Sequence, residues 1–515
     1  LSLLLPDENL LPSFIELGGI QALLELLTRF VASMLPKLLD CFLCIISVEQ
    51  IMFSQNHLTK INSFLLSADM AVRLTAIKLI DKMIERQCYD DDTIFAVIIE
   101  NLLRNAIPEA KSDVLLSALN LLIKLADFEA AKAQIRCVEG PNRICMLLEN
   151  ENQVILATAL RLLQLLFEGS VPKQRTISSF LSQFTAIIRR ADNDGQLEAL
   201  NALTMLMDNN LVYKEVSACH DFAKDFGLCI ESDDIIIQVS ALRICFAFCS
   251  NSITIDGFFS LIPRLLLLLK ASTYAAILSA FSIAALLSNK DPTEVLDESG
   301  EEKLKNFLVS SLTLESELTS PAVRLVGVLA ATMSGADLLL QWEIMEMVFN
   351  LLSSENEEIN HLALMAITAM SAVAPDAPIM IQTIPTLFEK CNDPSFGFYP
   401  LICISNITVD SSNAAACVPY IFYLFAYIGT TDRISTQRAL VALHRTLMAP
   451  EALNVVDGNE QLIDEFLQAV LNLWESEHAQ ILFGIIETLT RNPFACKKLD
   501  EKGVTEIVKN KLKTS

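Results

Sequence analysis

Apolar and polar residues follow one arrangement that returns about every forty residues along the chain. The segment SFLLSADMAVRLTAIKLI (63–80) is typical. It holds an apolar stretch, a polar turn and then an amphipathic helix with a small residue near its middle. This pattern predicts helices throughout and no β-sheet.

The small residue in the middle of the helix is the clearest marker of the repeat. Its nine intervals span 363 residues, so the mean period is about 40.3 residues, with single values from 36 to 47. A small side chain at one place per unit lets neighbouring helices approach closely, as a stacked array requires. The marker residue, or its equivalent, is Ala76, Ala118, Ala159, Ala199, Ala241, Ala280, Gly327, Ala363, Pro400 and Ala439.

Glycines give a second marker with the same period. FIELGGIQALLELLTR (14–29) contains two adjacent glycines, each of which costs a helix interior about 1 kcal/mol. Related contexts, VEGPNRICMLLEN (138–150) and DEKGVTEIVKNKL (500–512), align Gly19 with Gly140 and Gly503, and the separations of 121 and 363 residues are three and nine periods. We therefore expect a short helix to end at Leu17, the glycines to form a turn, and the next helix to begin at Ile20.

Units of about 40 residues with one short and two longer helices resemble the armadillo repeat. The resemblance covers nearly the whole chain and is best in the three glycine turns and in SNIT (405–408). It implies an all-α, right-handed α-solenoid of about twelve armadillo-like repeats. HEAT repeats are the alternative for central units such as LIPRLLLLLK (261–270), which lack the glycine turn.

We expect a single solenoid over residues 1–515, because no Ser-, Gly- or Pro-rich linker divides the chain. The longest interval, between Ala280 and Gly327, coincides with KDPTEVLDESGEEK (290–303), which holds six acidic residues. This segment predicts an inserted, solvated acidic loop, with a hinge or recognition loop as the alternative. Residue 1 is leucine, which is compatible with the repeat region of a larger multidomain protein.

The net charge of −24 argues against nucleic acid as a partner, because neutralising phosphates needs an excess of Lys and Arg. The thirteen cysteines fall mostly in apolar runs such as CFLCIIS (41–47), as is typical of reduced thiols in the cytoplasm or nucleus.

Two uncharged stretches, 271–289 and 411–431, are long enough to span a bilayer. Their Ser and Thr residues, Pro419 and Gly429 instead favour buried helices and no membrane span.

No motif for catalysis or cofactor binding occurs, since the sequence lacks a Walker loop, G-x-G-x-x-G, H-E-x-x-H and G-x-S-x-G. We therefore predict that the protein is not an enzyme and has no cofactor. Cys219, His220, Cys229, Cys245 and Cys249 match no common zinc spacing, which favours core thiols.

In armadillo proteins the third helix of each unit lines the concave face, and its exposed positions lie two and six residues after the small residue. Toward the N-terminus the first position is polar or basic, while the second is lysine in two repeats and then Leu165, Met205 and Ala247. The polar and basic residues form what we call the N-terminal ladder: Lys78, Lys82, Asn120, Lys124, Arg161, Asn201 and Arg243. Toward the C-terminus the first position becomes Ser282, Leu329, Met365, Ile402 and Val441.

The N-terminal ladder resembles, in kind, armadillo grooves that bind acidic extended ligands. It implies a protein–protein interaction scaffold or adaptor that binds an extended or helical partner segment, with an acidic extended segment at the ladder. The alternative is a nuclear-transport receptor or small-GTPase regulator of the armadillo/HEAT kind. Only Asn406 keeps the asparagine of importin alpha repeats, and their tryptophans are absent, which argues against an importin-type receptor. The oligomeric state is open.

Acidic residues also recur just before the marker helices, for example Asp69, Asp192, Asp234 and Asp393. Carboxylates at such places cap free backbone amides and oppose the helix dipole. We expect capping, which also creates an acidic edge along one side of the repeats.

Overall fold

Helices fill the computed structural model of this protein. It describes residues 10–29, 34–88, 94–219, 221–313, 316–428, 433–457, 459–473, 478–504 and 506, and these residues contain no strand. The prediction of an all-α chain is confirmed. The chain divides into two compact units, Leu1–Leu261 and Ile262–Ser515. A single solenoid over 1–515 stays a prediction.

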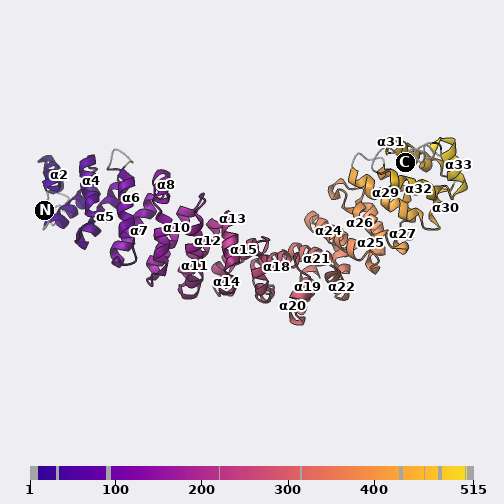
Figure 1. Cartoon of the computed structure of the whole chain (residues 1–515), viewed down its shortest axis with the longest axis horizontal. Coiled ribbons are helices and arrows are strands. Elements are labelled where there is room, and N and C mark those ends of the chain that lie inside the picture. The colour runs from indigo at the N-terminus through magenta and orange to yellow at the C-terminus, as the bar shows by residue number, and fades with distance from the viewer. Residues whose placement is uncertain are drawn as a thin grey trace. The chain divides into compact units, whose positions relative to one another are not determined.

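In its described residues, unit 1 consists of α-helices of 4 to 17 residues and two short 3-10 helices (Figure 1). They are α1 (Leu10–Glu16), α2 (Gly19–Arg29), α3 (Leu35–Val48), α4 (Gln55–Phe64), α5 (Met70–Glu85), α6 (Ile94–Asn105), α7 (Ser112–Leu125), α8 (Glu129–Cys137), α9 (Gly140–Cys145), η2 (Met146–Glu149), α10 (Gln153–Phe167), α11 (Gln174–Arg190), α12 (Asn193–Leu206), α13 (Asn210–Ala218), α14 (Phe222–Ile230), α15 (Ile235–Cys249), α16 (Ile255–Phe258) and η3 (Phe259–Leu261).

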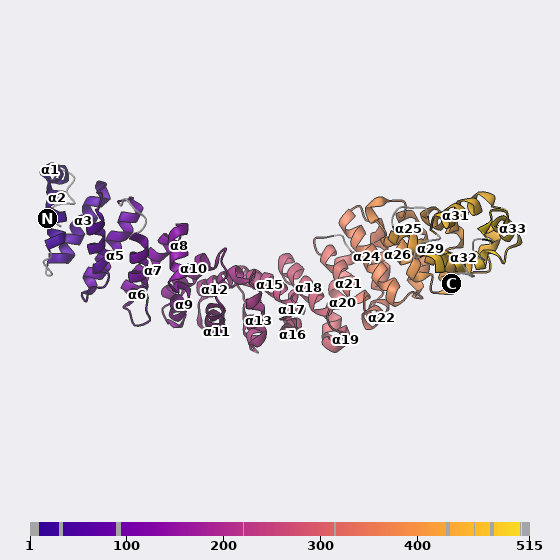
Figure 2. The same ribbon diagram turned by 45° about the horizontal axis from the view of Figure 1, so that its top comes forward.

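Unit 2 is also built of helices (Figure 2). Its helices are α17 (Ile262–Leu268), α18 (Thr273–Leu287), α19 (Pro292–Val295), α20 (Glu298–Thr313), α21 (Thr319–Ala330), α22 (Met333–Gln341), α23 (Ile344–Asn350), η4 (Leu351–Ser353), α24 (Glu357–Val373), α25 (Pro378–Lys390), η5 (Pro394–Phe396), α26 (Tyr399–Ile407), α27 (Ser411–Ala416), η6 (Val418–Tyr420), α28 (Ile421–Ile428), α29 (Arg433–Leu447), α30 (Ala452–Val456), α31 (Glu460–Leu473), α32 (Ala479–Leu489) and α33 (Pro493–Glu501).

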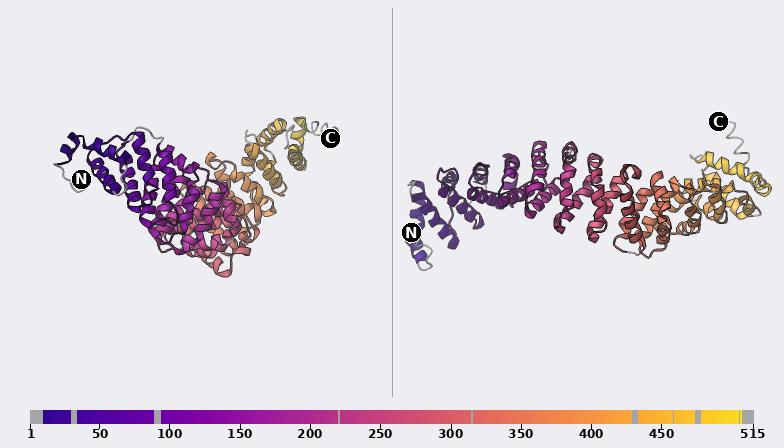
Figure 3. Two further views of the ribbon diagram at one scale, coloured as in Figure 1. Left: turned by 60° about the vertical axis from the view of Figure 1, so that its left-hand side comes forward. Right: turned by 90° about the horizontal axis from the view of Figure 1, so that it is seen from below.

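One helix of each repeat packs directly against its counterpart in the next repeat, and we call these the row helices. In unit 1 the row is α3, α5, α7, α10, α12 and α15. Figure 3 shows the helices of the chain in two further views. In unit 2 the row is α18, α21, α24, α26, α29 and α32. Within the described part of the chain the two rows hold twelve helices, in agreement with the predicted number of repeats.

The marker residue lies at the contact between row helices. Ala76, Ala118, Ala159, Ala199 and Ala241 are fully buried in unit 1, as are Ala280, Ala363 and Ala439 in unit 2. A methyl group at this place lets two helix backbones approach, whereas a longer side chain separates them. The sequence marker therefore identifies the packing seam of the repeats.

Gly327 is the one marker assigned to the wrong residue. In α21 the fully buried residues are Ala322, Val323, Leu325, Val326 and Leu329. The same spacing of buried residues follows the marker alanine in α10 and α15, so Ala322 is the equivalent of Ala159 and Ala241. A Cβ on Gly327 would lie 3.8 Å from the Cα of Ala366, an ordinary contact distance, so Gly327 also faces the neighbouring row helix α24.

The corrected marker removes the long interval and, with it, the predicted inserted loop at 290–303. Ala322 follows Ala280 by 42 residues and precedes Ala363 by 41. Residues 292–295 form α19, and residues 298–303 are the first part of α20. The acidic segment therefore supplies the short helix of a repeat and the start of its next helix.

Some repeats have the short first helix of an armadillo unit and others lack it. α8 precedes α9, and α22 precedes α23, in the three-helix arrangement. In contrast, α4 and α11 each follow a turn or extended connection, so these repeats have two helices, as HEAT units do. The chain therefore mixes the two kinds of unit.

Leu17 and Gly18 form the turn between α1 and α2, and Gly19 is the first residue of α2, so the helices end and begin one residue earlier than predicted. Gly18 has a φ of 74°, and a Cβ on Gly19 would lie 2.4 Å from the Phe14 ring, so each glycine is needed for a different reason. Glu139 takes the same left-handed place before α9, with a φ of 59°. Gly503 also has a φ of 74°, so it corresponds to Gly18 and not to Gly19 as the sequence alignment assumed.

Both uncharged stretches form short, buried helices of the repeats. Residues 273–287 are the row helix α18, and residues 411–428 are divided among α27, η6 and α28. In the described ranges of the chain, no helix is both long and apolar enough to cross a bilayer.

In unit 2, His361 links the row helix α24 to η5. Its Nδ1 lies 2.8 Å from the carbonyl oxygen of Glu357, and its Nε2 lies 2.9 Å from that of Ser395. Carbonyl oxygens only accept hydrogen bonds, so both ring nitrogens donate only when the imidazole is charged. These bonds, first that to Ser395, raise the pKa of His361 above its ordinary value, and the nearby carboxylates of Glu357 and Asp393 act in the same direction.

We predict that His361 makes unit 2 more stable below neutral pH than above it. The folded pKa is raised, so the contribution is fully present below the unfolded value of about 6.5 and is lost as the pH rises through the folded pKa. His361→Gln should flatten this pH dependence of the unfolding midpoint, whereas His57→Gln should not. An NMR titration that places the pKa of His361 at or below the unfolded value would contradict the prediction.

We predict that Ala159→Leu strongly destabilises unit 1. The larger side chain must enter a seam where Ala159 has no exposed surface, and such overpacking costs about 1–3 kcal/mol. Ala157→Leu, two residues earlier on the same helix and half-buried, should change the unfolding free energy by about 0.5 kcal/mol or less. Urea unfolding followed by circular dichroism compares the two. Equal midpoints would show that the seam tolerates a larger residue.

Candidate functional site

The structure places the N-terminal ladder on five consecutive row helices of unit 1. Lys78 and Lys82 lie on α5, Asn120 and Lys124 on α7, Arg161 on α10, Asn201 on α12 and Arg243 on α15. Lys78, Asn120, Lys124, Arg161 and Arg243 are exposed, and Lys82 and Asn201 are half-buried. Because the buried marker residue fixes how each row helix is rotated, the residue two places later takes the same side in every repeat.

Three cations of the ladder are paired with carboxylates that the sequence analysis did not single out. Lys124 Nζ lies 2.6 Å from Asp81 Oδ1 on the preceding row helix, and Lys82 Nζ lies 3.0 Å from Glu85 Oε2. Lys82, by hydrogen bond and charge, lowers the pKa of Glu85. These pairs join neighbouring repeats or neighbouring turns of one helix.

Arg161 makes the most structured of these pairs. Its Nε donates to Glu198 Oε1 at 2.6 Å, and Gln164 donates to the same carboxylate and to the backbone oxygen of Glu198. The hydrogen bond to Glu198 raises the pKa of Arg161. The side chain of Glu198 is 13% exposed and that of Arg161 is 65% exposed, so the carboxylate is anchored between repeats while the guanidinium remains accessible.

Lys78, Asn120 and Asn201 differ from the paired cations. Within the described ranges they form no hydrogen bond or ion pair with another side chain or with the backbone. An amide presents both a donor and an acceptor, which matches the backbone of an extended peptide. At the place two residues after the marker, the ladder thus alternates unengaged amides, Asn120 and Asn201, with cations, of which Arg161 already holds a carboxylate.

The C-terminal continuation of the ladder is only partly as predicted. Leu329 is fully buried, because the corrected marker puts Arg324 at the exposed place, where it pairs with Glu358 at 3.1 Å. Met365 is 46% exposed, whereas Ile402 and Val441 are half-buried and Ser282 is buried. The described residues at these places include only one cation, Arg324.

Asn406 also serves a contact between repeats. Its Nδ2 donates to Ser371 Oγ at 3.1 Å, and Arg445 donates to the carbonyl oxygen of Ser405 at 2.6 Å. The amide that the sequence comparison related to peptide binding therefore joins α26 to α24.

The acidic residues before the row helices cap them as expected. Asp69, Asp192 and Asp234 accept hydrogen bonds from amides at the starts of α5, α12 and α15, and Asp393 caps η5. At α10 and α24 the cap is an asparagine, Asn152 or Asn356.

Most of the cysteines are buried thiols, including Cys229, Cys245 and Cys249, whereas Cys219 is half-buried and Cys137 is exposed. Burial raises the pKa of Cys229 to about 12, and Cys145, Cys403 and others behave alike, so these thiols stay protonated. Cys245 and Cys249 lie 3.8 Å apart on α15 as free thiols, and His220 lies outside the described residues. No group of three potential metal ligands gathers in the described ranges.

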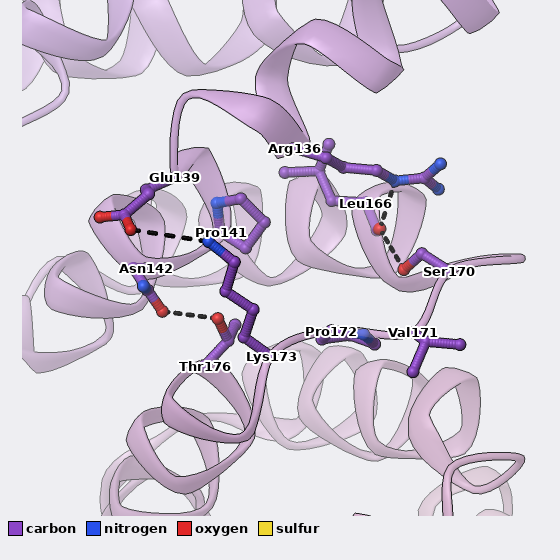
Figure 4. A pocket seen from close by; sticks show the side chains of 10 residues that line it. All are labelled: Arg136, Glu139, Pro141, Asn142, Leu166, Ser170, Val171, Pro172, Lys173 and Thr176. Carbon is purple, nitrogen blue, oxygen red and sulfur yellow. Dashed lines mark hydrogen bonds and ion pairs between the residues drawn. The ribbon is translucent and has the colours of Figure 1, made fainter.

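Figure 4 shows a cleft of about 140 Å³ between the α8–α9 turn and the start of α11. Its polar groups contact one another. Arg136 donates to the carbonyl oxygens of Leu166 and Glu168, Thr176 donates to Asn142 at 2.6 Å, and Lys173 pairs with Glu139 at 3.8 Å. The contacts across this small cleft therefore join neighbouring repeats, and few of its polar groups are left to bind a ligand.

The architecture is similar to solved repeat proteins. A structure from a study of the phosphorylation switch that controls the interaction between cadherin and beta-catenin aligns with a TM-score of 0.65 and 13% identity over 92% of this chain and 99% of that chain. An engineered protein from the Northeast Structural Genomics Consortium aligns with a TM-score of 0.62 and 18% identity over 76% and 98% of the two chains. Both show the fold, an armadillo/HEAT-type α-solenoid.

A scan against models of known protein families finds no match, and a search of curated proteins finds no significant relative.

We predict that Arg161 and Glu198 are coupled by about 1 kcal/mol in unit 1, at the upper end for accessible ion pairs. A double-mutant cycle of Arg161→Ala and Glu198→Ala in urea measures this energy. Lys82 and Glu85, paired within one helix turn, serve as the control and should give about 0.3–0.5 kcal/mol. A coupling near zero for the first pair would mean that it does not join the two repeats.

Proposed function

We propose that the chain is a protein-interaction scaffold or adaptor, and that its N-terminal ladder binds an extended, acidic segment of a partner protein. The fold is one that typically serves protein binding and is usually non-catalytic. The observation that carries the proposal is the alternation of unengaged amides, Asn120 and Asn201, with accessible cations at one place per repeat.

The spacing of the ladder suits an extended peptide. Packed helices lie about 8–10 Å apart, and an extended chain advances about 3.3 Å per residue, so one repeat corresponds to roughly three ligand residues. The amides of Asn120 and Asn201 would pair with the peptide backbone, while ligand carboxylates would meet Lys78, Lys124 and Arg161. We therefore expect acidic residues at about every third position of the bound segment.

The carboxylates already on the ladder set the selectivity of this site. A ligand must share or displace Asp81 at Lys124 and Glu198 at Arg161, and the net charge of −24 repels acidic chains that do not fit. Binding should therefore need several correctly spaced carboxylates and weaken with salt.

The alternative functions are a nuclear-transport receptor or small-GTPase regulator of the armadillo/HEAT kind, or the repeat region of a larger multidomain protein. The fold is shared by these classes, so the partner decides between them.

A pull-down under native salt with matched variants tests the proposal. Lys78→Glu, Lys124→Glu and Arg161→Glu together should weaken binding of the ladder's partner well over tenfold. The triple variant also loses the ion pairs to Asp81 and Glu198, so its melting temperature should fall modestly, and binding is compared at a temperature at which both proteins are folded. The control triple, Arg175→Glu, Lys214→Glu and Lys270→Glu, makes the same charge change at exposed residues outside the ladder and should retain the partner.

Asn120→Ala with Asn201→Ala supplies a test that leaves the charge unchanged, and it should also reduce partner binding. If every recovered protein binds the ladder variants and the control variants equally well, the ladder is not the binding site. Recovery of a small GTPase together with its cargo would favour the transport alternative, and turnover of a metabolite by the pure chain would exclude a scaffold as the sole function.

A further inference from the structure

A second cleft in unit 1 differs from the one in Figure 4 in size and in chemistry. It encloses about 340 Å³ beside the C-terminal end of α6 and the start of η2, within the usual range for binding pockets. Its accessible lining includes Arg104, Ile107, Pro108, Glu109, Arg143 and Met146. None of these residues belongs to a row helix, so this cleft is distinct from the N-terminal ladder.

The floor of the cleft is apolar and open. Ile107 is 43% exposed and Met146 is 60% exposed, above the buried residues Leu103 and Ala106. Exposed apolar side chains are common one at a time, but two large ones that line one hollow favour an apolar ligand group there. Methionine adapts its shape, so the hollow accepts more than one kind of side chain.

Two guanidinium groups at this cleft share one carboxylate oxygen. Arg104 Nε lies 3.4 Å and Arg143 Nη1 lies 3.7 Å from Glu100 Oε1. The described residues offer these two arginines no other hydrogen bond or ion pair. Two cations therefore share one anion, and most of their N–H donors have no partner within the described part of the chain.

The contrast with the cleft of Figure 4 makes this pair significant. There Arg136 donates to two backbone oxygens and Lys173 has its own carboxylate, Glu139, so the cations are satisfied within the chain. At the α6 cleft the guanidiniums keep donors for a second carboxylate, which they bind well because the fork of an arginine matches two oxygens.

Glu109 limits how much negative charge a ligand can bring. Its exposed carboxylate also lines the cleft and would repel a polyanion such as a nucleic acid. A ligand with one acidic group would pair that group with the arginines. An apolar group next to it would pack against Ile107 and Met146.

We propose that this cleft binds a short linear segment of a partner protein in which a large apolar side chain lies within two residues of a single carboxylate. The apolar side chain occupies the hollow over Ile107, Pro108 and Met146. The carboxylate accepts hydrogen bonds from Arg104 and Arg143. This site is independent of the ladder, and a partner that carries both kinds of segment would bind unit 1 at two places.

The test uses the full chain and a displayed library of random twelve-residue peptides. Peptides are selected on the wild type and counter-selected on Arg143→Glu and on Met146→Asp. We expect the enriched peptides to share an apolar residue within two positions of Asp or Glu. A synthetic peptide with that consensus should lose more than tenfold in affinity with either variant, and should bind Lys78→Glu as it binds the wild type.

Matched controls separate the cleft from general charge effects. Arg175→Glu makes the same charge change on α11, and Val154→Asp makes a similar apolar-to-acidic change at an exposed residue of α10, so both should retain the peptide. In the wild type, addition of the peptide should shift the methyl resonance of Met146, which reports contact without any substitution.

Several results would overturn the proposal. They are the absence of any peptide that depends on both Arg143 and Met146, a consensus that is basic or lacks an acidic residue, and an unshifted Met146 methyl at saturating peptide. If Met146→Asp lowers the melting temperature, its loss of peptide affinity is not used. The peptide affinity of Ile107→Asp and the peptide-induced shift of the Met146 methyl resonance then test the proposal. Failure of the ladder experiment leaves these outcomes unchanged, because Lys78 and its neighbours do not line this cleft.

Discussion

The close approach of successive row helices is the constraint on which the rest of the structure depends. In most row helices it places an alanine, or in α26 a proline, at the contact, and Ala159 and Ala199 show this place with no exposed surface. With the seam fixed, each helix has one rotation, so the residue two places later emerges on the same side in every repeat. The period of the sequence, the spacing of the N-terminal ladder and the burial of the core are consequences of this single contact.

Charge is organised locally in a chain that is strongly acidic overall. Carboxylates at helix starts cap free amides, as Asp69 does for α5, and others hold cations across the seam, as Glu198 holds Arg161. The ladder cations are therefore accessible and already oriented, which lowers the conformational entropy that a ligand must remove. The cleft beside α6 differs, because its two arginines share Glu100 and retain donors. The proposed binding of acidic segments follows from these two arrangements.

The repeat also shows how far a sequence pattern can be followed. In α21 both Ala322 and Gly327 are small, and both contact a neighbouring helix or its seam, so spacing alone did not choose between them. The choice of Gly327 produced a false insertion at 290–303 and put the buried Leu329 on the ladder. The row of buried residues from Ala322 to Leu329 corrected both. Gly503 was misaligned by one residue for a similar reason. A glycine can be required either by steric crowding, as at Gly19, or by a positive φ, as at Gly18 and Gly503, and the sequence does not distinguish the two.

The sequence by itself determined the all-α class, the period, the number of repeats, most of the seam residues, the caps and the residues of the N-terminal ladder. These features depend on side-chain size, apolar spacing and short-range hydrogen bonds, which recur within a few residues of the chain. Only the tertiary structure decided which carboxylate holds each cation, that His361 faces two carbonyl oxygens, and that Arg143 meets Arg104 at one cleft. Most of those contacts join residues about one repeat apart, and their geometry depends on how neighbouring helices pack.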